Sequence, residues 1–308
     1  MSKQQFPRDF RITVGPFEIQ ARKPDDTQTK VTLDERGQPN EATTQVFVTR
    51  PTLKATFKIE KSSDQSSPNK AEVSIWNLTE KNRSRLQEKG ADVLIEAGYV
   101  DNLFQLFKGT LTRTRIQRQD LDWVTTIDTG DGQKEYSGTR VNETFKAGTK
   151  VKDILNKLVG SFGLDAKSAL AKIADGDFLN GFDELKKGVT LSGRSSDMLD
   201  KWMKSVGLEW SIQDGRVVAN KADDTDDQET VRLFSTSGII GSPEIGEDGT
   251  LTARALLNGN IAPNRRVRVL TELVEGVYKV NKVTHTGDTW GNGPWFSNFV
   301  ARELYRVR

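Results

Sequence analysis

The chain has 308 residues, with no cysteine, a single histidine and 45 basic against 43 acidic side chains, which gives a formal net charge of +2. The lack of cysteine excludes disulfides, thiolate metal sites, iron–sulfur clusters and a cysteine nucleophile, and one histidine excludes any site that needs two. The near-balance of charge gives no support to nucleic-acid binding by bulk charge. No run approaches the roughly 20 apolar residues of a membrane helix, and residues 1–8 lack the apolar stretch of a signal peptide, so we expect synthesis in the cytoplasm.

The first 145 residues carry the alternation of apolar and polar residues that is typical of half-buried strands. These runs are 10–14, 17–20, 46–48, 53–59, 71–75, 93–99, 106–117 and 123–128. A polar insert at about residues 23–45 interrupts them, and Thr79 is placed to cap a short helix over 80–89. We therefore expect residues 1–145 to form an antiparallel β-barrel domain. Its core should contain Val73, Ile75, Val93, Ile95, Leu111 and Ile127.

The middle of the chain, residues 146–222, contains one apolar pattern twice, at a constant offset of 44 residues. Each copy has apolar residues at i, i+1, i+4, i+5 and i+8, which is one face of an α-helix, followed by a glycine suited to a helix C-terminus. Asp214-Gly215 then predicts a hairpin with a type I′ turn. We expect a small α+β domain built around two similar helices. Its core should contain Leu155, Leu158, Leu199 and Trp202.

Residues 223–229 form an acidic connector, and the chain beyond it has only strand and turn patterns. The strand patterns are 231–234, 249–253, 266–270, 276–280 and 299–305. We interpret residues 223–308 as a second β domain. The predicted fold class is mainly β with a small α+β insert, in which two antiparallel β-barrel domains lie on either side of a two-helix domain.

The motifs that could carry chemistry have simpler structural interpretations. Gly130-Asp131-Gly132 lacks the third glycine and the following helix of a dinucleotide loop, so we interpret it as a turn. The acidic run 223–229 lacks the full ligand pattern of a calcium loop. His285 could pair with Asp288, but a strand histidine with a structural hydrogen bond is favoured. We expect no catalytic residue, no cofactor and no metal, while a carboxylate pair for sugar cleavage stays open because spatial pairing is invisible in a sequence.

The loop at residues 288–296 places three large aromatic side chains among turn residues. They are Trp290, Trp295 and Phe296. An exposed aromatic cluster would suit a protein interface, which makes these residues candidate partner contacts. The alternative, which we favour slightly, is that the rings fold back and cap the end of the second β domain.

Several segments together resemble a recurrent pattern of phage tail proteins. The pattern is a strand, an Asn-Leu corner, a short helix, an Ala-Gly-Tyr strand and a Phe-x-Gly strand. The matching segments are 71–79, 97–99 and 106–109, followed by 145–155, 241–245, 256–258 and 282–288. The likeness is to the baseplate hub family of contractile bacteriophage tails, and it covers most of the chain. These motifs are structural corners without chemistry.

The resemblance implies a homotrimer at the tip of the tail tube, within the virion baseplate. In that family each subunit offers two barrel domains similar to the tube protein, so that three subunits give a ring of quasi-sixfold symmetry. One face of the ring docks on the tail tube protein and the other carries the central spike protein, beside other baseplate proteins. Genomic DNA would pass only transiently through the lumen, and no membrane anchor is implied. A ring needs strand edges rather than a reactive pocket, and we expect no enzyme.

Two other functions stay open. One is a distal adaptor of a non-contractile tail, which sixfold instead of threefold symmetry would support. The other is a cell-wall-binding module, in which the duplicated helices of residues 146–222 would bind peptidoglycan.

Overall fold

The computed structural model describes residues 8–22, 53–63, 68–87, 89–99, 102–176, 179, 183–221, 224–225, 229–290 and 293–305. The polar insert expected at 23–45, the strand expected at 46–48 and most of the acidic connector at 223–229 lie outside these residues. The helices of the described residues include none that is long and apolar enough to cross a membrane.

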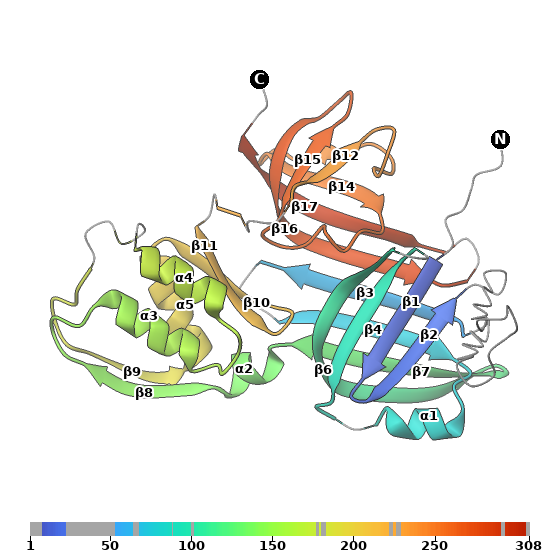
Figure 1. The fold of residues 1–308 in the computed structure, drawn as a ribbon, viewed down its shortest axis with the longest axis horizontal. Helices are drawn as coiled ribbons and strands as arrows, with labels where there is room; N and C mark the ends of the chain where they lie inside the picture. The colour runs from blue at the N-terminus through green and yellow to red at the C-terminus, as the bar shows by residue number, and fades with distance from the viewer. Residues whose placement is uncertain are drawn as a thin grey trace, which may run out of the picture.

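The described part of the first β region contains seven strands and one short helix (Figure 1). They are β1 (Arg8–Val14), β2 (Phe17–Arg22), β3 (Ala55–Ser62), β4 (Asn69–Trp76), α1 (Glu80–Arg85), β5 (Asp92–Tyr99), β6 (Asn102–Gln119) and β7 (Asp122–Asp131). Thr79 caps α1 as predicted, because its side chain accepts a hydrogen bond from the backbone N–H of Asn82. The six residues expected in the core are all buried in one hydrophobic cluster, which confirms the alternation from which they were chosen.

The middle region contains four helices and two small antiparallel sheets. They are α2 (Gln133–Gly138), β8 (Arg140–Phe145), α3 (Val151–Gly160), α4 (Lys167–Asp175), β9 (Val189–Arg194), α5 (Ser195–Ser205), β10 (Leu208–Gln213) and β11 (Arg216–Lys221). The duplicated pattern corresponds to α3 and α5. Leu155, Leu158 and Leu199 are fully buried in one cluster, and Trp202 packs against it partly buried.

The hairpin predicted in this region is confirmed, but two of its helices were not anticipated. Asp214 and Gly215 have φ angles of 54° and 75°, the positive values that a type I′ turn between β10 and β11 requires. Helix α4 lies between the two similar helices in the chain and buries only Ala169 and Ile173, too few apolar residues for a clear pattern. The interpretation that no helix follows Gly132 was wrong, because α2 begins at the next residue; this short helix buries no residue fully and so shows no apolar period.

The second β region contributes six strands. They are β12 (Val231–Phe234), β13 (Glu244–Ile245), β14 (Thr250–Leu256), β15 (Arg266–Leu270), β16 (Glu275–Asp288) and β17 (Trp295–Tyr305). β12 pairs in parallel with β15, and the other pairs of this region are antiparallel.

Both β regions belong to one open sheet of 13 strands, in the order β13-β14-β17-β16-β3-β4-β7-β6-β5-β1-β2, with β15 and β12 joined to β16. The expectation of two closed barrels was therefore wrong for the described strands. The sheet curls, and Phe10 of β1 stacks on Phe57 of β3 with 5.4 Å between ring centroids. β1 and β3 contact each other through these side chains and are not hydrogen-bonded as neighbouring strands. The pairing of β3 with β16 instead connects the two β regions, and Figure 1 shows these two strands side by side where the regions meet.

Candidate functional site

The two β regions are joined by the pairing of β3 with β16, which we call the seam. Seven residue pairs lie in register, from Lys282 opposite Ser62 to Asp288 opposite Thr56. The Thr289 hydroxyl accepts a hydrogen bond from the backbone N–H of Ala55 at 2.9 Å, which continues the connection beyond the last strand pair. The seam joins segments more than 200 residues apart in the chain into one sheet.

Side-chain contacts also connect the second β region to β1, β3 and β5 of the first. Trp295 of β17 is buried, and its Nε1 donates a hydrogen bond of 3.2 Å to the carbonyl oxygen of Gly98 in β5. Its ring contacts Phe57 edge-on at 5.4 Å between centroids. Arg8 of β1 donates a hydrogen bond of 2.7 Å to the carbonyl oxygen of Asp288. The end of the second β region is thus built into the core of the first.

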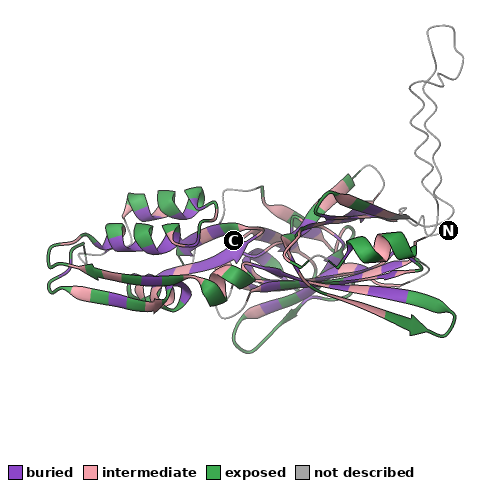
Figure 2. Ribbon diagram, turned by 90° about the horizontal axis from the view of Figure 1, so that it is seen from below, coloured by how far each residue is buried: buried purple, intermediate pink, exposed green. Residues whose placement is uncertain are grey.

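One face of the sheet across the seam is polar. Alternate residues of each strand point to opposite faces, and one set is buried while the other is exposed or half-buried, as the alternating colours of Figure 2 show. We call the exposed or half-buried set on β16, β3, β4 and β7 the polar face. Its members are Lys282, Thr284, Thr286, Asp288, Thr56, Lys58, Glu60, Ser62, Lys70, Glu72, Ser74, Trp76, Thr126 and Asp128. The strand register gives one unbroken row of such residues from Thr286 through Lys58 and Glu72 to Asp128.

Several charges of the polar face form ion pairs, either with each other or with Arg115 of β6. Lys58 lies 2.7 Å from Glu60, and the hydrogen bond from Lys58 is the main reason that the pKa of Glu60 lies below its usual value. Arg115 of β6 contacts both Glu72 and Asp128 at 3.0 Å. A surface with both signs interspersed presents no strong field of either sign to a molecule that passes along it.

The structure separates the three aromatic residues that the sequence groups together. Trp295 is buried and so does not lie on the surface, Trp290 is 38% exposed, and Phe296 is half-buried under the guanidinium of Arg254, 4.5 Å from the ring centroid. Phe296 lies opposite Leu256 of β14, which is itself exposed. The role of these residues as partner contacts stays a prediction, and it now rests on Trp290 and Phe296.

His285 has the structural role that the sequence favours. It is fully buried, and its Nδ1 is hydrogen-bonded to the hydroxyl of Ser297 at 2.8 Å. Burial lowers the pKa of His285 to about 3, so the ring is neutral at physiological pH. Among the described residues there is no group of three or more His, Asp or Glu side chains that could hold a metal ion.

The attachment of the β10–β11 hairpin to the first β region depends on polar contacts that the sequence does not reveal. Asp131 at the end of β7 accepts hydrogen bonds from the backbone N–H groups of Asp214 at 2.6 Å and Gly215 at 2.9 Å. Lys61 of β3 pairs with the Asp214 side chain at 2.7 Å. Burial raises the pKa of Asp131 to about 6. No motif marks these residues, because they meet only when the turn of the hairpin reaches the sheet.

A second unpredicted feature is the tip of the β6–β7 hairpin. Leu121 at this tip is 87% exposed, and the neighbouring Trp123 is 42% exposed with the guanidinium of Arg83 4.6 Å from its ring centroid. Exposed apolar side chains on a projecting hairpin favour contact with another protein surface.

Comparison with solved structures shows that this chain has the fold of phage tail proteins. It is similar over 96% of its length to 98% of the 43 kDa tail protein of prophage MuSo2 from Shewanella oneidensis, with a TM-score of 0.61 and 9% identity. It is equally similar to a tail protein from Neisseria meningitidis MC58, with a TM-score of 0.61 and 12% identity over 97% of both chains. The resemblance to phage tail proteins is thereby confirmed at the level of the fold.

A third similar structure comes from a secretion system. It is the E. coli c3393 protein, a component of the type VI secretion system with structural similarity to the T4 bacteriophage tail proteins gp27 and gp5. The TM-score is 0.55, with 11% identity over 83% of this chain and 76% of the other. No family model and no curated protein sequence matches the chain. The relationship is therefore visible in the three-dimensional structure, whose strand order joins the two β regions of this chain in a single tail-protein fold.

Proposed function

We propose that this chain is a baseplate hub subunit of a bacteriophage tail, which forms a ring between the tail tube and the central spike and lets DNA pass through its lumen. The observation that carries the proposal is the seam, because it turns two β regions of one chain into a continuous wall with one polar face. The similarity to prophage tail proteins over nearly the whole chain supports it. The similarity of the type VI secretion component to tail proteins gp27 and gp5 points in the same direction.

The proposed ring contains three copies of the chain. Each copy would supply two tube-like units, the first β region with β1–β7 and the second with β12–β17, and the middle region from α2 to β11 would be a lateral α+β unit. Six such units would then match a sixfold tube, while the threefold repeat would match a trimeric spike. The polar face would line the lumen, since DNA moves more freely past paired charges and hydroxyl groups than past an unpaired cationic surface. The exposed apolar tip at Leu121 would contact a neighbouring ring.

Assembly would use the outer edge of β2, which is the last strand of the sheet path among the described strands. Val14 pairs with Phe17 across a two-residue turn, so Ile12 and Ile19 form a hydrogen-bonded pair and the N–H of Gln20 points away from β1. Unpaired edge groups of this kind are templates for pairing with another chain.

Electron microscopy of the purified chain mixed with the tail tube protein and spike protein of the same virus tests the proposal. We expect a threefold ring at the end of the tube. A sixfold ring would instead support the distal adaptor, and binding of the chain to peptidoglycan without any ring would support a cell-wall-binding module. A chain that stays monomeric and joins no particle would refute the hub function.

A variant at the outer edge of β2 tests the mode of assembly. Gln20→Pro removes an outward N–H without touching the β1–β2 hydrogen bonds, so it should weaken ring formation at least tenfold while leaving the unfolding midpoint nearly unchanged. Gln20→Thr, which keeps the N–H, is the matched control. Equal ring formation by both variants, measured by mass photometry, would show that this edge does not pair between subunits.

A further inference from the structure

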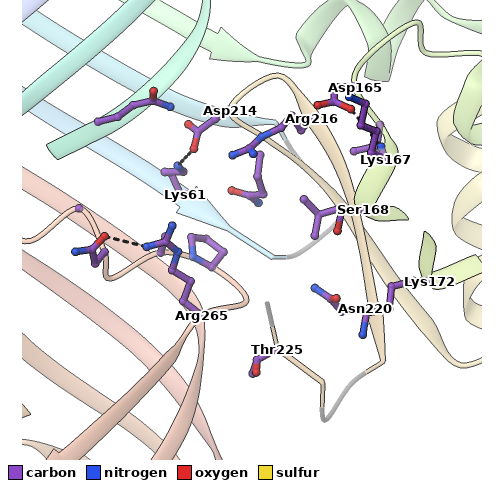
Figure 3. A pocket seen from close by; sticks show the side chains of 18 of the residues that line it. Lys61, Asp165, Lys167, Ser168, Lys172, Asp214, Arg216, Asn220, Thr225 and Arg265 are labelled. Carbon is purple, nitrogen blue, oxygen red and sulfur yellow. Dashed lines mark hydrogen bonds and ion pairs between the residues drawn. The ribbon is translucent and has the colours of Figure 1, made fainter. Parts of the chain in front are cut away.

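The three regions of the chain meet around a cavity of about 550 Å³ (Figure 3). Lys61 of β3 and Gln105 of β6 line it from the first β region, and Arg265 lines it from the second. Lys167 of α4 and Arg216 of β11 line it from the middle region. A volume of this size lies within the range of small-molecule sites.

The lining is cationic. Among the described residues, five lysines and arginines line the cavity together with two carboxylates, those of Asp165 and Asp214. When Asp224, which pairs with Lys172, is counted as well, these described groups carry a net charge of +2. The lining cations are Lys61, Lys167, Lys172, Arg216 and Arg265. Figure 3 shows Lys61 and Arg265 on the side of the sheet and Lys167 and Lys172 on the side of α4.

The carboxylates are already engaged. Asp214 pairs with Lys61 through one oxygen and accepts a hydrogen bond from the backbone N–H of Lys108 at 3.1 Å through the other. Asp224 pairs with Lys172. Asp165 accepts a hydrogen bond from the backbone N–H of Lys167 at 3.2 Å.

Three of these cations have no charged partner among the described residues. Within the described part of the chain no ion pair involves Lys167, Arg216 or Arg265, and Arg265 donates only to the amide oxygen of Asn260, at 3.0 Å. Like charges around a shared cavity repel each other, and an anion between them relieves that repulsion. An arginine guanidinium can donate two parallel hydrogen bonds to two oxygens of a phosphate group, which a halide ion cannot accept in the same way. The cavity has two arginines that can bind phosphate in this manner.

We infer that this cavity binds a small phosphate-bearing anion with at least two negative charges. Neutral donors are present for its remaining oxygens, since the Ser168 hydroxyl and the Gln105 amide also line the cavity. The anion would contact walls from all three regions and would stabilise their arrangement by mass action. The inference goes beyond the hub function and does not depend on it.

The test uses the full chain and inorganic pyrophosphate, with sodium chloride at matched ionic strength as the reference. Isothermal titration should show one site per chain, and pyrophosphate should raise the unfolding midpoint above that in chloride. ADP in place of pyrophosphate tests whether the ligand is a nucleotide, and adenosine, which lacks phosphate, should not bind. No heat and no shift beyond the chloride reference would overturn the inference.

Paired variants locate the site. Arg216→Gln with Arg265→Gln should lower the affinity for pyrophosphate at least tenfold, and without ligand this double variant should be as stable as the parent because it removes mutual repulsion. Lys58→Gln, which removes a cation from the polar face instead, is the matched control and should bind normally. Should the double variant fail to fold, Lys167→Gln alone must still weaken binding. Equal affinity of the cavity variants and the control would refute the site.

Discussion

The seam and the hairpin attachment are two junctions of one molecule that are built in opposite ways. The seam combines backbone pairing with buried aromatic rings, and Trp295 from the second β region lies in the hydrophobic core of the first. The β10–β11 hairpin meets the sheet through polar groups, with Asp131 and Lys61 at its turn and Lys279 and Arg302 near Glu209. Three separate hydrophobic clusters remain, one of which belongs to the middle region alone.

This difference determines which parts can move. Opening the seam would expose aromatic rings and break a ladder of hydrogen bonds, so the two β regions should unfold together. Opening the hairpin attachment exposes mostly polar groups that water can solvate. The free energy needed to shift the middle region against the sheet should therefore be lower than the free energy needed to open the seam. The joined β regions should therefore be stiffer than their attachment to the middle region.

The largest expected effect comes from the aromatic ring in the seam. Trp295→Ala should lower the free energy of unfolding by about 3–5 kcal/mol, because it leaves a cavity beside Phe57 and removes the hydrogen bond to Gly98. Trp290→Ala, in the same loop but exposed, is the control and should change the stability by less than about 0.5 kcal/mol. Urea unfolding measures both. A small loss for Trp295→Ala would show that the seam does not depend on this ring.

The pH dependence of the two junctions should have opposite signs. His285 lies in the seam opposite Ile59 and has a folded pKa of about 3, below its unfolded value. The unfolded state therefore binds the proton first, and stability falls as the pH drops from about 6.5 toward 3. Asp131 has a folded pKa of about 6, above its unfolded value, so its contribution is fully present below about pH 4 and is lost as the pH rises through 6. Each slope approaches at most about 1.4 kcal/mol per pH unit.

Hydrogen exchange, corrected for the intrinsic rate at each pH, separates the two contributions. Between pH 6 and pH 4 the amides of residues 283–287 should lose protection while those of Asp214 and Gly215 gain it. His285→Asn, which does not titrate, should flatten the first trend and leave the second. Trends of the same sign at both junctions would contradict this account.

A smaller effect should come from crowding the seam at a glycine. Gly287 of β16 lies opposite Phe57 and Trp295, and a Cβ at this position would come within 2.2 Å of the Phe57 ring and 2.9 Å of the Trp295 ring. Gly287→Ala should therefore cost about 1–3 kcal/mol, the usual range for overpacking. Gly160→Ala, where no atom lies within 4 Å of the added Cβ, is the control and should be neutral or stabilising. Thermal unfolding compares the two variants.

The sequence predicts local features of this molecule far better than it predicts the junctions. Alternation identifies most described strands, and Asp214-Gly215 identifies the hairpin, because both signals depend on near neighbours. The pairing of Thr56 with Asp288 has no such signal, since strand runs of similar pattern can pair in many orders, and two barrels were expected where one open sheet occurs. Asp131 looks like a turn residue until the hairpin meets it. The polar face could be predicted residue by residue but not as one surface.

The smallest expected effect is at the second contact of the hairpin. Glu209 of β10 lies 3.4 Å from both Lys279 and Arg302, and Lys279 is buried, with a pKa lowered mainly by that burial and raised in part by Glu209. Because Glu209 itself is 40% exposed, water screens much of the attraction, and Glu209→Gln should cost only about 0.5–1 kcal/mol. Glu60→Gln, which removes a similar partly exposed partner of Lys58 on the polar face, is the control. Exchange of the β10–β11 amides should become faster in Glu209→Gln alone while the seam amides stay unchanged. Faster exchange at the seam as well would mean that the two junctions are coupled, and that the middle region moves together with the two β regions.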